Sequence, residues 1–120
     1  FRRRQRQMCI RDRYMIGLMY HQGHGVAINF ERARLWFLKA AKQGYANAQF
    51  MYAFMVQAGE GEKSDPATAM VWALVAEMNG KNDTVAITVP AEMTMTEIEV
   101  TTAEKIANEC FQSNYQNCPD

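Results

Sequence analysis

The chain has 120 residues, with 13 Lys+Arg and 13 Asp+Glu, so its formal net charge is zero. This length allows one domain with a modest core, and a 48% apolar fraction with 22% charged residues argues against disorder. The longest apolar run, residues 69–76, is too short to span a bilayer, and the neutral total gives no reason to expect nucleic acid as a partner.

The arginines are concentrated at the start of the chain, where residues 1–13 hold six of the eight. This segment could be a basic arm for nucleic acid or an anionic surface, or the arginine-rich flank of a targeting signal. A third interpretation is that it is not native protein, because Met8 to Arg13 resembles one reading frame of a transposon-end sequencing adapter (ATG TGT ATA AGA GAC AG). We interpret residues 1–13 as a non-native artefact segment and exclude them from functional reasoning.

Removing this segment changes the totals. The remainder has 7 basic and 12 acidic residues and therefore a net charge of −5. Cys9 also drops out, which leaves an even pair of cysteines. The natural N-terminus is then expected to lie upstream, so the lack of a visible signal peptide carries no information about export.

An internal repeat with a period of 36 residues follows. Both tryptophans of the chain obey this shift, which chance rarely arranges. Each unit predicts two helices, so we divide this part of the chain into a first unit, 14–45, and a second unit, 46–81. The superposed pairs are Met15 with Met51, Met19 with Met55, Gly23 with Gly59, Gly25 with Gly61, Ala33 with Ala69, Trp36 with Trp72, Ala40 with Ala76 and Gly44 with Gly80.

The first unit predicts helices over residues 14–22 and 30–43. Gly23 and Gly25 end the first helix, because glycine tolerates the left-handed conformation that follows a helix C-terminus. Asn29 is the predicted N-cap of the second helix. The predicted buried stripe of that helix consists of Ala33, Trp36, Phe37, Ala40 and Ala41.

The second unit repeats these signals. Asp65 takes the N-cap position and Pro66 suits the first helical turn. Trp72, Ala73 and Ala76 repeat the buried stripe.

The methionines at helical spacing on the two first helices are predicted to pack in the core. The alternative is a copper(I) site, since thioethers are soft ligands. The four residues are Met15, Met19, Met51 and Met55.

Residues 82–120 predict a degenerate third unit and a closing helix. The segment 83–92 is expected to form a short or irregular helix, because it is rich in β-branched residues and Pro90 would break its last turn. Thr94 and Glu97 have the spacing of a capping box, and a helix should follow to about Ser113. Its predicted buried residues are Ile98, Thr102, Ile106 and Cys110.

These motifs resemble the Sel-one-like repeat (SLR) family, an α/α relative of the tetratricopeptide repeat. The family motif is approximately Leu-Gly-x-x-Tyr-x-x-Gly-x-Gly-Val, then an acidic or amide cap, Ala, Trp, Lys-Ala-Ala and Gly. The first unit is nearly complete, whereas Ala53, Val56 and Glu62 depart from the motif in the second. The matching structural positions are Gly17, Tyr20, Gly23, Gly25, Ala33, Trp36, Ala40, Gly44, Gly59, Gly61, Ala69, Trp72, Ala76 and Gly80.

The resemblance implies an all-α fold. It would be a right-handed α/α superhelix of about two SLR helix pairs, a degenerate third unit and a C-terminal capping helix. A capping helix of this kind covers the last exposed core face of a solenoid.

The resemblance also implies a non-enzymatic scaffold or adaptor of bacterial type that binds a protein or peptide partner, with no cofactor and no metal. Stacked pairs leave a concave face lined by their first helices. Non-consensus positions on those helices should contact the partner, although several could instead pack against a missing upstream repeat. The candidates are Tyr14, Leu18, His21, Gln22, Gln49, Tyr52, Phe54 and Gln57.

Two other functions are considered. Some SLR proteins are linked to β-lactam hydrolysis, so a hydrolase of β-lactam or cell-wall-type substrates is one alternative, but neither Ser64 nor Ser113 begins a Ser-x-x-Lys motif. The other is a structural fragment of a longer repeat array.

Cys110 and Cys118, eight residues apart, could form a disulfide that holds the tail against the last helix. The chain ending also resembles those of small exported SLR proteins of bacteria. A disulfide predicts a periplasmic or secreted location. The alternative is a buried thiol at Cys110 and an unrelated free thiol at Cys118, which is compatible with the cytoplasm.

His21 and His24 are the only histidines. Further ligands at standard spacing are missing, so a metal site is not expected. Both are interpreted as solvated loop residues.

Overall fold

The structure is a computed structural model that describes residues 2–119, with side chains from residue 10 onward. The described chain forms helices and no strands, which confirms the all-α prediction. The helices are α1 (Arg2–Gln22), α2 (Phe30–Lys42), α3 (Ala46–Ala58), α4 (Pro66–Met78), α5 (Val85–Met93) and α6 (Glu97–Gln112).

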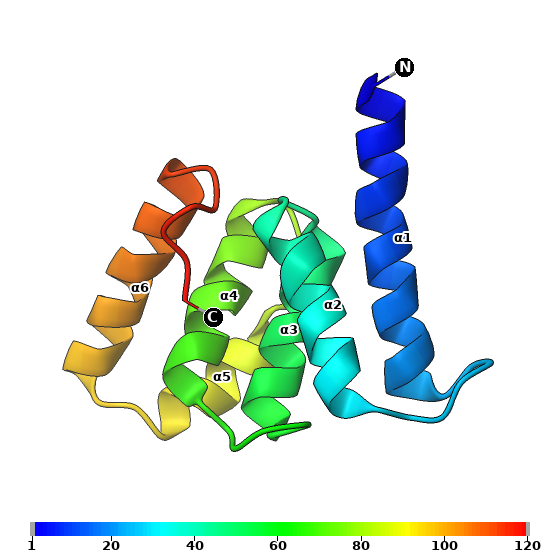
Figure 1. Ribbon diagram of the computed structural model, residues 1–120. Helices are drawn as coiled ribbons and strands as arrows, with labels where there is room; N and C mark the ends of the chain where they lie inside the picture. The colour runs from blue at the N-terminus through cyan, green and yellow to red at the C-terminus, as the bar shows by residue number, and fades with distance from the viewer. Residues whose placement is uncertain (1, 120) are drawn as a thin grey trace.

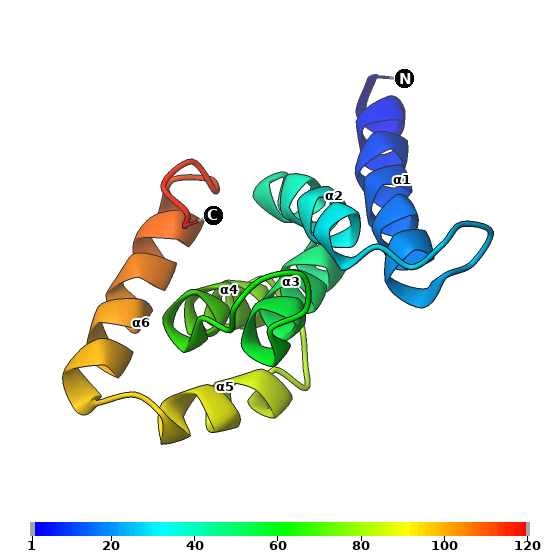
Figure 2. The same ribbon diagram turned by 60° about the horizontal axis from the view of Figure 1, so that its bottom comes forward.

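The helices form an array of antiparallel pairs. Figure 1 shows α1 and α3 running in one direction and α2, α4 and α6 in the other. α4 is the most enclosed element, because α3, α5 and α6 all pack on it. Figure 2 shows α5 and α6 on two sides of α4. The largest fully buried side chains are Trp72, Phe37, Met55, Met70 and Ile87.

The predicted caps of the second helices are confirmed. Asn29 Oδ1 accepts a hydrogen bond from the Arg32 amide at 3.1 Å, and Asp65 Oδ1 accepts one from the Thr68 amide at 3.3 Å. Each side chain satisfies an amide that the helix itself leaves unbonded. Gly44 follows α2 with φ +92°, the left-handed geometry that ends the helix.

Helix α1 begins at Arg2, twelve residues before the predicted start at Tyr14. Arginine, glutamine and methionine are good helix formers, and residues 2–13 contain neither glycine nor proline to end the helix. The interpretation of residues 1–13 as a non-native segment is not tested by this geometry. It stays a prediction, and residue 1 lies outside the described residues.

The predicted capping box of α6 is wrong by two residues. The N-cap is Thr96, whose Oγ1 accepts from the Glu99 amide, while Glu99 Oε1 accepts from the Thr96 amide, both at 3.2 Å. Thr94 instead ends α5, where its hydroxyl donates to the Ala91 carbonyl. The two threonines offer the same spacing to an acidic residue, so the local pattern could not choose between them.

The predicted buried face of α6 is correct for Cys110, which is buried, and in part for Ile106, which is half-buried against the core, but it is wrong for the other two residues. Ile98 is 79% exposed and Thr102 is exposed, whereas Ala103 and Ala107 are buried with Cys110. Small side chains on this face allow α6 to approach α4 closely. Ile98 lies on the exposed side of α6, because the close contact between α6 and α4 requires side chains that are small as well as apolar.

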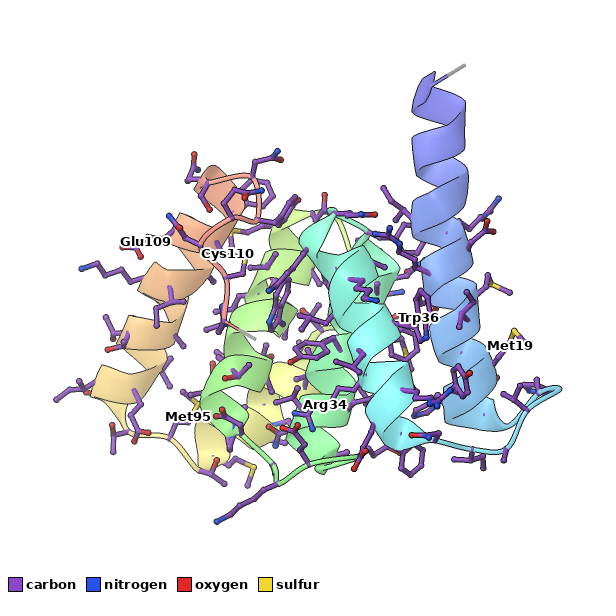
Figure 3. The ribbon with its side chains drawn as sticks, viewed as in Figure 1. Met19, Arg34, Trp36, Met95, Glu109 and Cys110 are labelled. Atoms are coloured by element: carbon purple, nitrogen blue, oxygen red, sulfur yellow. A yellow bond between two sulfur atoms is a disulfide. The ribbon has the colours of Figure 1, made fainter. Side chains whose placement is uncertain are left out.

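Three predicted core residues of the first unit are only partly covered. Met15 is 50% exposed, Met19 is 38% exposed and Trp36 is half-buried. Figure 3 shows Met19 on the side of α1 that faces away from α2. The equivalents of Met19 and Trp36, which are Met55 and Trp72, are fully buried, because other helices cover them. Met51, the equivalent of Met15, is half-buried. For Met15 and Met19, the prediction of core packing is therefore wrong in the described chain.

α5 is short, as predicted, but Pro90 does not break it. The helix runs from Val85 to Met93 with Pro90 inside. Within residues 2–119, no helix has both the length and the apolar character needed to cross a membrane.

Candidate protein-binding site

Two of the eight predicted contact residues are exposed on the first helices of the two repeats, and a third, Leu18, is partly covered by the core. Leu18 on α1 and Phe54 on α3 occupy equivalent positions 36 residues apart, and Phe54 is 41% exposed. Leu18 is half-buried, and Gln22 in the last turn of α1 is exposed. An apolar residue on each repeat, together with a neighbouring amide, is an arrangement that can contact an extended or helical partner.

Gln49 must be removed from the contact residues, because it is fully buried. Its Nε2 donates to the Ala41 carbonyl at 3.0 Å, and its Oε1 accepts from Asn79 Nδ2 at 3.5 Å. Asn79 Nδ2 also lies 2.7 Å from the Gly44 carbonyl. Gln49 therefore joins α2, α3 and the end of α4, and a partner cannot reach it.

Tyr52 is corrected for the same reason. It is buried, with its ring packed edge-on against Trp72 at a centroid distance of 5.8 Å. The Arg34 guanidinium lies 5.8 Å from the same ring. Tyr52 thus connects α3 to both second helices.

Tyr14 is half-buried at the edge of the candidate face. Its ring lies 5.7 Å from that of Phe37 and 5.1 Å from that of Tyr45. Burial, and then the neighbouring Tyr45, raise the pKa of the Tyr14 phenol above 10.0. The hydroxyl therefore stays protonated at neutral pH.

His21 is not a solvated loop residue. It lies in the last turn of α1, and its Nε2 is 3.0 Å from Glu60 Oε1 in the loop between α3 and α4. Its ring also packs against Phe30 and Phe37, at 5.5 and 6.3 Å between centroids. His21 therefore connects the first repeat to the second. His24, by contrast, is exposed in the loop after α1, as predicted.

The sequence reasoning missed Arg34, which contacts the same loop. It is 9% exposed, its Nη1 donates to the Glu60 carbonyl at 3.3 Å, and Nη1 lies 3.9 Å from Glu62 Oε2. The repeat contained a signal for this contact, because the equivalent of Arg34 in the second unit is Met70, which is a core residue. A charged residue at a core position of the repeat indicates a buried contact.

Gln57 is half-buried, and its Oε1 has no hydrogen-bond partner among the described residues. Its backbone carbonyl accepts from the Ser64 hydroxyl at 2.8 Å. Ser113 Oγ likewise donates to the Cys110 carbonyl. Both hydroxyls are thus directed at main-chain oxygens rather than at a histidine.

Metal-binding groups do not gather in the described part of the chain. Within it, no three of the His, Cys, Asp and Glu side chains form a cluster that could hold an ion.

The C-terminal tail folds back over the last helices. The structure joins Cys110 to Cys118, with their Cα atoms 4.7 Å apart. Trp72 Nε1 donates to the Pro119 carbonyl at 2.8 Å, and the Tyr115 ring lies against Gly44. The tail therefore connects α6, α4 and the turn after α2.

Both repeats match a known protein family. The family profile described as Sel1 repeat matches residues 13–45 and again residues 46–81. Chitin synthase regulatory factor 3 of Schizosaccharomyces pombe is 42% identical over 52 residues, which is 43% of this chain and 6% of that protein.

A solved structure is similar over most of the chain. A protective antigen present in uropathogenic Escherichia coli strains, whose crystal structure displays an SLR fold, superposes with a TM-score of 0.77 and 25% identity. The match covers 86% of this chain and 22% of the antigen. The chain thus spans only a small part of either similar protein.

Proposed function

The chain belongs to the Sel1 repeat family, and from this premise we propose that it is a non-enzymatic scaffold for protein–protein interaction. Sel1 repeats in general mediate protein–protein interaction. We further propose that the binding face lies on α1 and α3 and includes Leu18, Gln22 and Phe54.

One observation carries the proposal. The repeat buries its shared residues, including Ala33, Ala69 and Trp72, and leaves Phe54 accessible on α3 with Leu18 at the equivalent position of α1. Large apolar side chains held at a fixed spacing by a rigid array are suited to anchoring a partner.

Site-specific photo-crosslinking in the native host tests this face. A photoreactive amino acid at Leu18 and, separately, at Phe54 should capture the same protein. The matched control is Leu35, which is 60% exposed on α2, outside the proposed face.

The captured protein is then purified, and its affinity for the unlabelled chain is measured. Phe54→Ser should weaken binding by about tenfold, the scale of one buried anchor at an interface. Equal capture from Leu35, or an unchanged affinity of Phe54→Ser, contradicts the proposed face.

A second proposal concerns a longer array. The exposure of Met19, whose equivalent Met55 is fully buried, supports the packing of a further helix pair against α1. Met19→Lys should leave the stability of the 120-residue chain almost unchanged. In the uninterrupted genomic reading frame it should cost about 2 kcal/mol, because the charge would be buried. Equal losses in both proteins contradict this stacking.

We also propose export to an oxidising compartment, supported by the proximity of Cys110 and Cys118. Thiol labelling followed by mass spectrometry on fractionated native cells should find both cysteines blocked, in the periplasmic or secreted fraction. Recovery of free thiols from the cytoplasm contradicts this location.

A further inference from the structure

Two hollows lie along one side of α6, away from the proposed binding face. The small residues of α6 hold it close to α4 and leave room beside the contact. A hollow of about 320 Å³ between α4 and α6 is lined by Leu74, Glu77, Met78, Glu104, Ala107 and Asn108. A second, of about 430 Å³, lies at the end of α5 and is lined by Glu92, Met95, Glu97, Val100 and Thr101.

The two hollows follow one another along α6. The α6 residues that line them recur every three or four positions from Glu97 to Asn108, so they share one face of the helix. This face extends for about 16 Å at 1.5 Å per residue. We call the two hollows together the α6 groove, and Figure 2 shows the three helices that border it. Its length matches about three turns of a second helix.

The apolar lining of the α6 groove is adaptable. Met78 is 37% exposed and Met95 is partly buried, and Leu74 and Val100 lie beside them. Figure 3 shows Met95 near the end of α5. Methionine side chains adjust to irregular partners, which is why they are common at surfaces that take varied helices.

The polar lining of the groove is acidic. Four carboxylates border it, and no lysine or arginine is among its lining residues. Within the described chain, none of the groove carboxylates forms an ion pair with a basic side chain, although Glu77 Oε2 accepts a hydrogen bond from the Thr84 hydroxyl at 3.4 Å. Lys105, the basic residue of α6, projects about 100° around the helix from Glu104. The four carboxylates belong to Glu77, Glu92, Glu97 and Glu104.

We propose that the α6 groove binds a basic amphipathic helix of about three turns. The apolar face of that helix packs on Met78, Leu74 and Val100, and its lysines or arginines pair with the groove carboxylates. Charge complementarity selects a basic partner, and the apolar lining selects one with large aliphatic side chains. This surface is distinct from the face of Leu18 and Phe54, so either can fail without the other.

A synthetic probe tests this assignment. The probe is a fluorescein-labelled 14-residue amphipathic helix of leucine and lysine, and its binding to the purified 120-residue chain is followed by fluorescence anisotropy. Two comparison peptides replace every lysine with glutamate or every leucine with serine. The leucine–lysine helix should bind at least tenfold more tightly than either.

Matched variants separate the groove from general attraction to an acidic protein. Glu97→Gln with Glu104→Gln should weaken binding about tenfold. The control pair, Glu31→Gln with Glu109→Gln, makes the same change in net charge and should stay within twofold. Both control residues are exposed, and Figure 3 shows Glu109 on the side of α6 that faces away from α4.

The apolar contribution is tested in the same assay. Met78→Gln should weaken binding about fivefold, and Leu35→Gln, an exposed position outside the groove, should not. Circular dichroism verifies that each variant keeps the wild-type helix content. The assignment is overturned if the two pairs of glutamate substitutions weaken binding equally, or if the serine peptide binds as well as the leucine–lysine peptide. It is also overturned if the wild-type chain does not bind the leucine–lysine peptide.

Discussion

At the scale of single residues, close approach explains why some positions of the repeat accept only small side chains. Gly17 lies inside α1, five residues before the helix ends at Gln22, where glycine otherwise weakens a helix. A Cβ added there would lie 2.7 Å from two ring carbons of Phe37, which is itself fully buried. The absence of a side chain at residue 17 therefore sets the distance between α1 and α2.

Gly17→Ala is expected to destabilise the chain. Overpacking costs about 1–3 kcal/mol, and the better helix propensity of alanine offsets about 1 kcal/mol, so the free energy of unfolding should fall by about 1 kcal/mol. Urea denaturation measures the change. In a chain that already carries Phe37→Leu, Gly17→Ala should cost less than it does in the wild type, because the smaller side chain leaves room for the added methyl group. A Gly17→Ala variant more stable than the wild type contradicts the close contact.

Tyr14 predicts a dependence of stability on alkaline pH. Because its pKa is raised in the folded state, the folded chain binds the phenolic proton more tightly than the unfolded chain does. The resulting stability is present below pH 10.0 and is lost as the pH rises through the raised pKa. The stability of the wild type relative to Tyr14→Phe should therefore fall between pH 8 and about pH 11. Urea denaturation at both pH values measures this, and an unchanged difference contradicts it.

At the scale of helices, side-chain caps mark the start of some elements but not of others. α2, α4 and α6 each have a side chain that accepts a hydrogen bond from an amide of the first turn. α3 and α5 have no such side-chain bond, so packing against neighbouring helices has to hold their starts. The capped helices are thus the second helices of the repeats and the closing helix.

The capping box of α6 predicts a difference between two nearby glutamates. Glu99→Ala removes the bond to the Thr96 amide and should cost about 1 kcal/mol. Glu97→Ala, the control two residues earlier, loses only a favourable charge near the helix start and should cost about 0.3 kcal/mol. Thermal denaturation of the two variants compares them. The opposite order would support the box at Thr94 and Glu97.

At the scale of the whole molecule, the tail connects parts that are distant in sequence. Tyr115 reaches the turn at Gly44, and the Pro119 carbonyl accepts from Trp72 of α4. The bond between Cys110 and Cys118 closes the short loop that holds these contacts. The tail thus covers Trp72, whereas its equivalent Trp36 is half-buried with Lys39 over its ring.

Reduction of this disulfide should destabilise the whole array. Closing a loop across a sequence separation of eight residues contributes about 2.5 kcal/mol on the chain-entropy estimate. Guanidinium denaturation with and without dithiothreitol should show a loss of about this size. The control, Cys110→Ala with Cys118→Ala, should not respond to the reductant. An equal response in the control, or none in the wild type, contradicts the prediction.

The sequence by itself determined the repeat, its helices and most of their ends. The N-caps at Asn29 and Asp65 and the stop at Gly44 are local signals, because each depends on residues within one turn of the position. The 36-residue period shows that such signals recur along the chain. The same period marked Phe54 as a non-consensus position of the repeat, equivalent to Leu18. It also placed Trp72 in the core.

Only the tertiary structure decided which side chains are accessible. Gln49 and Tyr52 lie on a first helix like Phe54, yet α2 and α4 cover them. His21 lies beside Glu60 only because the second repeat stacks on the first. Burial depends on side chains that other helices supply, and a pattern within one helix does not specify them.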